Sequence, residues 1–148
     1  FPIWAQIFRE SGYKVSFISN QVTPVSDDWC SEMGIYFFQH PDVALRSFDY
    51  RNYDLYKYDD GILAELETVD NQLDSSGCEL TILQLKGQHI YAKNNFPHDK
   101  FTKFTVEDYR AEKNFLNDSQ MQEIADYDNA TLYNDYVVSE IIKKYQDK

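Results

Sequence analysis

Residues 79–97, ELTILQLKGQHIYAKNNFP, contain the stretch that decides the fold of this chain. Its first half is a short apolar run, made of Leu80, Ile82, Leu83 and Leu85, that does not alternate cleanly with polar residues. Such a run is typical of a strand in a parallel sheet, where side chains are covered on both faces. The stretch therefore predicts a buried parallel strand and, with it, an α/β fold.

The strand ends in a turn that carries polar side chains, because Lys86–Gly87 is followed at once by Gln88 and His89. In open α/β sheets, ligands bind outside the carboxyl ends of the strands. We therefore expect His89 to project from this turn toward a binding site. The alternative is that glycine and polar residues end the strand for turn geometry alone.

The preceding part of the chain predicts the rest of a parallel unit. Apolar residues at helical spacing from Ile3 to Phe8 predict a helix that stops at Ser11–Gly12, and residues 13–18 are rich in strand formers. Asn20 and Gln21 then lie at the carboxyl end of this strand, the same kind of edge as His89. Their side chains either hydrogen-bond a ligand there or satisfy the backbone of the loop.

The middle of the chain continues the alternation of helices and strands. We expect a short helix ending at Met33, a strand at residues 35–38, and a turn at His40 with little functional weight. Residues 42–57 have no clear period and indicate a surface segment, with an anion-binding patch as the alternative. An apolar stripe from Ile62 to Leu73 predicts a helix whose acidic start, Asp59–Asp60, suits a helix N-terminus.

The last third of the chain is expected to be helical at its end. Residues 98–118 indicate a loop with a short helix at residues 107–115, and His98 is expected to be an exposed loop residue. A long helix is predicted over residues 120–145, with Asp118 or Ser119 as its N-cap. Asp128 and Asn134 lie near its apolar face and are expected to pin neighbouring loops.

Composition restricts the functions that the chain can have. Its 148 residues carry a net charge of −11, which argues against a nucleic-acid partner because there is no basic surface to contact phosphates. No apolar stretch approaches the roughly 20 residues of a membrane helix. Cys30 and Cys78 lie far apart, and unpaired buried thiols are favoured over a disulfide. Since the chain starts in a helical pattern without Met, we expect a piece of a longer protein.

Three segments, in this order, resemble the lipopolysaccharide phosphoethanolamine transferases of the alkaline phosphatase and sulfatase superfamily. The central one is Gly87-Gln88-His89 with the following Asn95-Phe96-Pro97, which is similar to the family's Gly-Ser/Thr-His and aromatic-Pro pattern. The others are residues 12–21, a Gly-Tyr-Lys strand that ends in Ser-Asn-Gln, and residues 127–138, which resemble the family's long helix. The resemblance implies a partial three-layer α/β/α fold with a mostly parallel sheet, like that of alkaline phosphatase.

The resemblance also implies an activity. Family members use a threonine held against Zn²⁺ to take phosphoethanolamine from a phospholipid and pass it to a lipopolysaccharide-type acceptor. It implies that His89, with Asn20 and Gln21, binds substrate, and that the whole protein acts at the periplasmic face of the inner membrane, reached through membrane segments outside this chain. This chain itself is expected to be a soluble fragment that self-associates.

The chain departs from the family in ways that limit these expectations. The family's nucleophile and main zinc ligands lie outside residues 1–148, so we expect a partial catalytic domain, without catalytic or metal-binding residues of its own and inactive in isolation. Gln88 stands where the family usually has Ser or Thr, and Asn95 where it often has Arg. The alternatives are a sulfatase or phosphoglycerol transferase of the same superfamily, and a non-catalytic α/β binding module.

Overall fold

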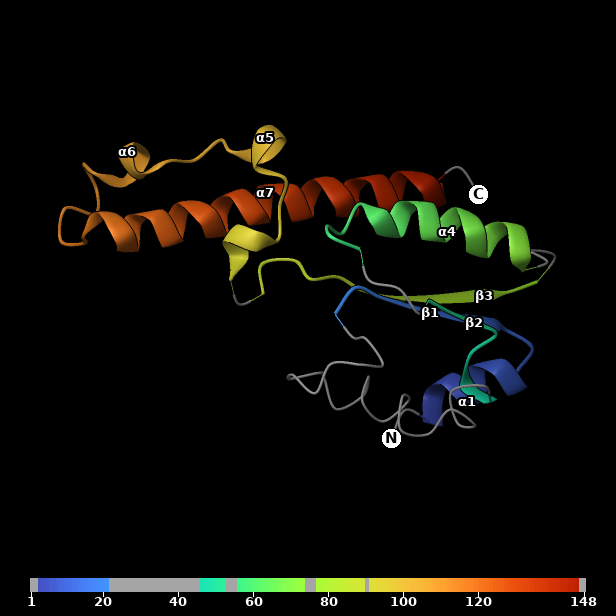
Figure 1. Cartoon of the computed structure of the whole chain (residues 1–148). Helices are drawn as coiled ribbons and strands as arrows, with labels where there is room; N and C mark the ends of the chain where they lie inside the picture. Colours follow the sequence, from blue (N-terminus) through green and yellow to red (C-terminus); the bar gives the residue numbers. More distant parts are fainter. Residues whose placement is uncertain (1–2, 22–45, 53–55, 74–76, 90, 147–148) are drawn as a thin grey trace. The chain divides into compact units, whose positions relative to one another are not determined.

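The computed structural model describes residues 3–21, 46–52, 56–73, 77–89 and 91–146 (Figure 1). The helix and strand expected between residues 26 and 38, His40 and Cys30 lie outside these ranges. The chain divides into two compact units. Unit 1 comprises residues 1–56 and 61–85, and unit 2 comprises residues 57–60 and 86–148.

Unit 1 is a parallel sheet with helices on its faces. Its strands, β1 (Lys14–Ser19), β2 (Tyr50–Arg51) and β3 (Glu79–Gln84), lie in the order β2-β1-β3, and β1 is parallel to both neighbours. Helix α1 (Ile3–Glu10) and helix α4 (Gly61–Gln72) lie on opposite faces of this sheet (Figure 1). The predicted α/β class and the parallel pairing of the two long strands are thus confirmed.

The core of unit 1 is organised around β1, because this strand has a neighbour on each side. Val15, Phe17 and Ile18 are buried, and the ring of Phe17 stacks on that of Phe48 with 5.2 Å between centroids. On the other face, α4 buries an apolar stripe at the predicted helical spacing, Ile62, Leu66 and Val69.

The burial expected for β3 was wrong. All six of its residues are only half-buried, whereas five of the six residues of β1 are buried. Within the described ranges β3 pairs with β1 alone, so its other edge has no strand to cover it. Cys78, just before β3, is an exposed free thiol, which corrects the expectation of a buried one.

Strand β2 was not predicted, because two residues are too short to show a period. Residues 42–57 were expected to be a surface segment, and this is wrong for the part around β2. Asp49 explains how so short a strand is held: its carboxylate accepts a hydrogen bond from the backbone N–H of Val15 at 2.9 Å and pairs with Arg9 at 3.1 Å.

Unit 2 is built on helix α7 (Asp118–Gln146), which confirms the predicted long helix. Its buried residues recur at helical spacing and are Met121, Ala125, Asn129, Ala130, Tyr133 and Val137. The expected N-cap was off by one or two residues. Asn117 Oδ1 accepts the N–H of Gln120, and Gln120 Oε1 accepts the N–H of Asn117, both at 3.0 Å, in a reciprocal capping box.

Three short helical segments accompany α7 in unit 2: η1 (Ala92–Asn94), α5 (His98–Phe101) and α6 (Val106–Tyr109). The single helix expected at residues 107–115 is therefore wrong in its extent, since α6 starts and ends earlier. Asp128 pins this region as expected, because it accepts a hydrogen bond from the hydroxyl of Tyr109. Asn129, which was not predicted, holds the segment between α5 and α6 with three hydrogen bonds.

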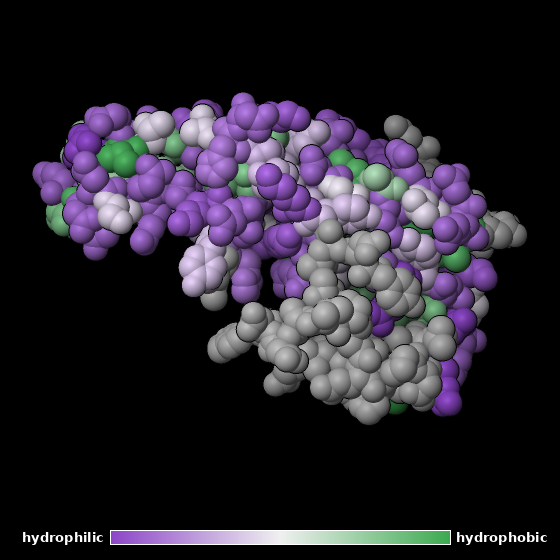
Figure 2. Space-filling model, viewed as in Figure 1, coloured by the Kyte–Doolittle hydropathy of each residue, from purple (hydrophilic) through white to green (hydrophobic). Residues whose placement is uncertain are grey.

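The face of the molecule shown in Figure 2 is largely polar. On the face shown in Figure 2, hydrophilic residues cover most of the surface that is not grey, and apolar residues appear as separate small patches. None of the helices in the part of the chain that the structure describes is long and apolar enough to cross a membrane.

Candidate functional site

The turn at residues 86–89, inside the stretch 79–97, is held by hydrogen bonds to its backbone groups. Gly87 adopts φ +52°, a left-handed conformation that glycine tolerates without strain. His89 then donates its backbone N–H to the carbonyl of Lys86 at 3.1 Å, and Asn95 Nδ2 donates to the carbonyl of His89 at 3.2 Å. The backbone of His89 is therefore fixed on both sides while its side chain is exposed.

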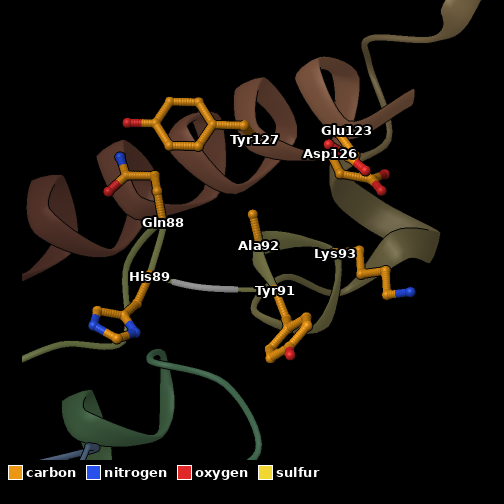
Figure 3. Close-up of a pocket in the computed structure, with 8 residues that line it drawn as sticks. All are labelled: Gln88, His89, Tyr91, Ala92, Lys93, Glu123, Asp126 and Tyr127. Carbon is orange, nitrogen blue, oxygen red and sulfur yellow. The ribbon is translucent and has the colours of Figure 1, made fainter. Parts of the chain in front are cut away.

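This turn, η1 and helix α7 line a half-open cavity of about 450 Å³ in unit 2 (Figure 3). Gln88, His89 and Tyr91 line it from the turn, and Ala92 and Lys93 from η1. Helix α7 contributes a second group, Glu123, Asp126 and Tyr127, whose spacing places them on one helical face. The predicted site residue His89 thus lies at a cavity, together with residues that the sequence reasoning did not select.

The cavity presents both signs of charge. Lys93 is cationic, whereas Glu123 and Asp126 are anionic, and Gln122 Nε2 donates a hydrogen bond to Asp126 Oδ1 at 2.9 Å. Figure 3 shows the two carboxylates side by side on α7 and the amide of Gln88 directed toward the ring of Tyr127. The cavity can therefore receive a ligand that carries an anionic and a cationic group.

Asn20 and Gln21, the other predicted site residues, belong to unit 1 and meet the end of β3. Asn20 is fully buried, and its Oδ1 accepts the backbone N–H of Tyr56 at 2.7 Å. The side chain of Gln21 donates to the carbonyl of Leu85 and accepts from Gln84 Nε2 at 3.2 Å. These contacts agree with the alternative in which both amides satisfy the loops, and a substrate-binding role for them stays a prediction.

His98 is exposed, as expected, and lies in α5 rather than in a loop. Its Nε2 is 2.6 Å from the carbonyl oxygen of Lys93, and its ring contacts that of Phe96 with 4.3 Å between centroids. These contacts give it a local structural role, and it does not line the cavity.

Asp59 is the residue at this site whose role the sequence reasoning missed. It was assigned to the start of α4, but its carboxylate accepts the backbone N–H groups of Lys86 at 3.0 Å and of Gly87 at 2.8 Å. Burial lowers the pKa of the Lys86 ammonium, and the charge of Asp59 partly opposes this effect. No local pattern distinguishes such a buried carboxylate from an ordinary acidic helix start.

The resemblance implies zinc, so we ask whether the described residues include side chains that could bind it. Among the residues that the structure describes, no group of three or more His, Cys, Asp or Glu side chains is placed to hold a metal ion. The described residues by themselves do not form a zinc site.

Comparison with known proteins assigns the class. The family model described as Sulfatase matches residues 2–148, and the chain therefore belongs to the sulfatase family. This membership agrees with the predicted alkaline-phosphatase-like α/β fold.

Two curated relatives extend the comparison, both called phosphoethanolamine transferase EptC, from Escherichia coli strain K12 and from Escherichia coli O18:K1:H7. The chain is 30% identical to each of them over 145 residues, which is 98% of this chain and 24% of the relative. It thus spans about a quarter of their length. No solved structure matches the chain.

Proposed function

We propose that this chain is part of a transferase that moves phosphoethanolamine from a phospholipid donor to a lipopolysaccharide-type acceptor. The observation that carries the proposal is the exposed His89 at a cavity of about 450 Å³, in a chain of the sulfatase family that is 30% identical to a phosphoethanolamine transferase. The catalytic nucleophile belongs to the part of the enzyme outside residues 1–148.

The charges around the cavity support phosphoethanolamine rather than a simple anion. The transferred group carries a phosphoryl anion and an ammonium cation about two carbon atoms apart. His89 and Lys93 suit the anion, whereas Glu123, Asp126 and the face of the exposed Tyr127 ring suit the cation. A ligand with negative charge alone would be attracted by Lys93 but repelled by the two carboxylates, and it would leave them without a cationic partner.

His89 has two roles open to it in this reaction. As an imidazolium it stabilises the negative charge that develops on a phosphoryl oxygen, and as a neutral imidazole it exchanges a proton with the entering or leaving oxygen. In both cases the fixed backbone of His89 keeps the ring at the cavity. The two roles differ in pH dependence, because the first requires the protonated ring.

The setting of the whole protein is part of the same proposal. We expect zinc in the full-length enzyme, with its main ligands outside this chain, and action at the periplasmic face of the inner membrane. The partners are the phospholipid donor and the lipopolysaccharide-type acceptor, with membrane contact through segments other than residues 1–148. The isolated chain is expected to be inactive.

The test uses the full-length parent protein and three donors in parallel: phosphatidylethanolamine, phosphatidylglycerol and an aryl sulfate. We expect release of diacylglycerol from the ethanolamine lipid, and a loss of about 100-fold or more in kcat/KM for His89→Ala. His98→Gln is the matched control, because this exposed histidine lies outside the cavity and glutamine can still donate to the carbonyl of Lys93, and it should retain activity within about twofold. Equal activity of His89→Ala and the wild type would refute the role of His89.

A sulfatase is the second candidate, because the family model that matches residues 2–148 is described as Sulfatase. It predicts turnover of the aryl sulfate and none of the lipids. A protein that releases sulfate but no diacylglycerol would replace the first proposal by this one.

A further inference from the structure

Asp59 anchors the turn that carries His89. Asp59 is only 1% exposed, and each oxygen of its carboxylate accepts a backbone N–H. Oδ1 accepts that of Lys86 at 3.0 Å, and Oδ2 accepts that of Gly87 at 2.8 Å. Two consecutive amides on one carboxylate fix the orientation of the peptide plane between Lys86 and Gly87.

His89 is only two residues after Gly87, so the orientation of the peptide between Lys86 and Gly87 determines where His89 lies. Gly87 turns the chain with φ +52°, and the backbone N–H of His89 closes the turn onto the carbonyl of Lys86 at 3.1 Å. The carboxylate thus holds the N–H of Lys86 while His89 holds the carbonyl of the same residue. A rotation of that peptide would displace the imidazole from the wall of the cavity.

The anchor is itself tied to helix α7. The backbone N–H of Asp60 donates to the hydroxyl of Tyr133 at 2.9 Å, and Tyr133 is a buried residue of α7. Gly87 also lies against α7, since a Cβ at this position would be 3.4 Å from Asn134 Oδ1. Because α7 carries Glu123, Asp126 and Tyr127 of the cavity, segment 57–60 links the His89 turn to a helix that lines the same cavity.

We propose that Asp59 is a positioning residue, which sets His89 at the cavity and acts on the reaction only through His89. This inference rests on the proposed function of His89. Asp59→Asn is the sharpest probe, because it keeps the shape of the side chain and replaces one acceptor oxygen by an NH₂ group. That group faces a backbone N–H, so one hydrogen bond is lost and two donors are opposed.

The experiment is a double-mutant cycle in the full-length parent protein, with diacylglycerol release as the measurement. We expect Asp59→Asn to lower kcat/KM about tenfold in the presence of His89, and less than about twofold in the His89→Ala background. Glu112→Gln removes the same charge from an exposed carboxylate outside the cavity and outside segment 57–60, and it should leave activity within about twofold. Effects of Asp59→Asn that are equal in the two backgrounds would overturn the proposal.

The cycle also separates this inference from the proposed function. If His89→Ala has no effect, the role of His89 in the reaction fails, and with it the inference. If His89→Ala abolishes most of the activity and Asp59→Asn does not, only the positioning role of Asp59 fails. A hydrogen-exchange measurement on this chain tests the anchor without activity: Asp59→Asn should speed exchange of the Lys86 and Gly87 amides at least tenfold while amides in the centre of α7 keep their rates.

A second variant covers the case in which Asp59→Asn does not fold. Tyr133→Phe removes the hydroxyl that accepts the N–H of Asp60 and leaves the carboxylate intact. It should also speed amide exchange at Lys86 and Gly87, and its effect on kcat/KM should be smaller in the His89→Ala background. Unchanged exchange at both amides in Tyr133→Phe would show that segment 57–60 does not control the turn.

Discussion

Asn129 in α7 is 1% exposed and uses both ends of its amide. Its Oδ1 accepts the N–H groups of Lys103 at 2.8 Å and of Phe104 at 2.9 Å, and its Nδ2 donates to the carbonyl of Phe104 at 2.8 Å. One side chain thus satisfies three backbone groups of the segment between α5 and α6. Such a clamp stabilises a loop that has no regular structure of its own.

Asn129→Ala should therefore destabilise the chain by about 3 kcal/mol, because three hydrogen bonds of a buried side chain are lost. The measurement is urea unfolding followed by circular dichroism. Asn114→Ala, an exposed position, is the control and should change the free energy of unfolding by less than about 0.5 kcal/mol. A loss of similar size in both variants would contradict the clamp.

Three tyrosines should make the stability of the fold sensitive to high pH. Burial, together with nearby carboxylates, raises the pKa of Tyr50, Tyr109 and Tyr133 above the ordinary value of 10.0, and the backbone N–H of Asp60 only partly opposes this for Tyr133. A pKa that is higher in the folded than in the unfolded state stabilises the fold fully below about pH 10, and this contribution is lost as the pH rises further.

We expect the free energy of unfolding to fall between about pH 10 and pH 11.5. The fall should be shallower in Tyr109→Phe, because this variant lacks one of the tyrosines whose pKa is raised. The measurement is urea unfolding at several values of pH, with tyrosinate absorbance as a second signal. Identical slopes for Tyr109→Phe and the wild type would show that the Tyr109–Asp128 pair does not contribute.

At the scale of elements, the sequence predicted what depends on local patterns. The apolar spacing of α1, α4 and α7 and the apolar run of β3 were sufficient to find them. Strand β2 and the burial of β3 depend on neighbours distant in the chain, which no local pattern encodes. The same distinction applies to the site: Gly87 and His89 were found at a strand end, whereas Asp59 gains its role only from a contact 27 residues away.

Gly61, the first residue of α4, shows how tertiary contacts override helix propensity. Alanine is favoured over glycine in a helix by about 1 kcal/mol. However, a Cβ at Gly61 would lie 2.2 Å from Cγ of Tyr56, whose N–H is bonded to Asn20 and whose hydroxyl is bonded to Glu65. Because Tyr56 is held at both ends, it cannot yield without losing hydrogen bonds.

Gly61→Ala is therefore expected to lower the free energy of unfolding by about 2 kcal/mol or more, the usual cost of overpacking. Gly77→Ala is the matched control, because a Cβ there meets nothing within 4 Å, and it should be nearly neutral. Both variants are compared by thermal and urea unfolding. A stabilised Gly61→Ala would show that propensity dominates at this helix start.

At the scale of the whole molecule, exposed apolar groups bear on the behaviour of the isolated chain. Within the described residues β3 has a partner strand on one side only, and α1 exposes Ile3 and Ile7 at 59% and 54% of their surfaces. Open sheet edges and apolar surface favour association between copies. The net charge of −11 opposes it through repulsion.

We expect the isolated chain to self-associate at high concentration and at high salt, where the repulsion is screened. Sedimentation velocity over a range of concentrations measures this. Thr81→Lys places a charge on β3 and should weaken association, whereas Thr68→Lys, on the exposed face of α4, makes the same change away from the sheet. A monodisperse monomer that binds no hydrophobic dye would contradict the expectation.

The clamp formed by Asn129 also bears on how this chain can be produced in a eukaryotic secretory host. Residues 117–119 and 129–131 both match the acceptor sequence for N-linked glycans, Asn-x-Ser/Thr. Asn117 is exposed, so the folded chain can be modified there, whereas a sugar on the amide nitrogen of Asn129 would break its bond to Phe104 and leave no room for the loop. Glycosylation of Asn129 is best prevented by Thr131→Val, because this change removes the acceptor sequence and keeps the Asn129 side chain that holds the loop.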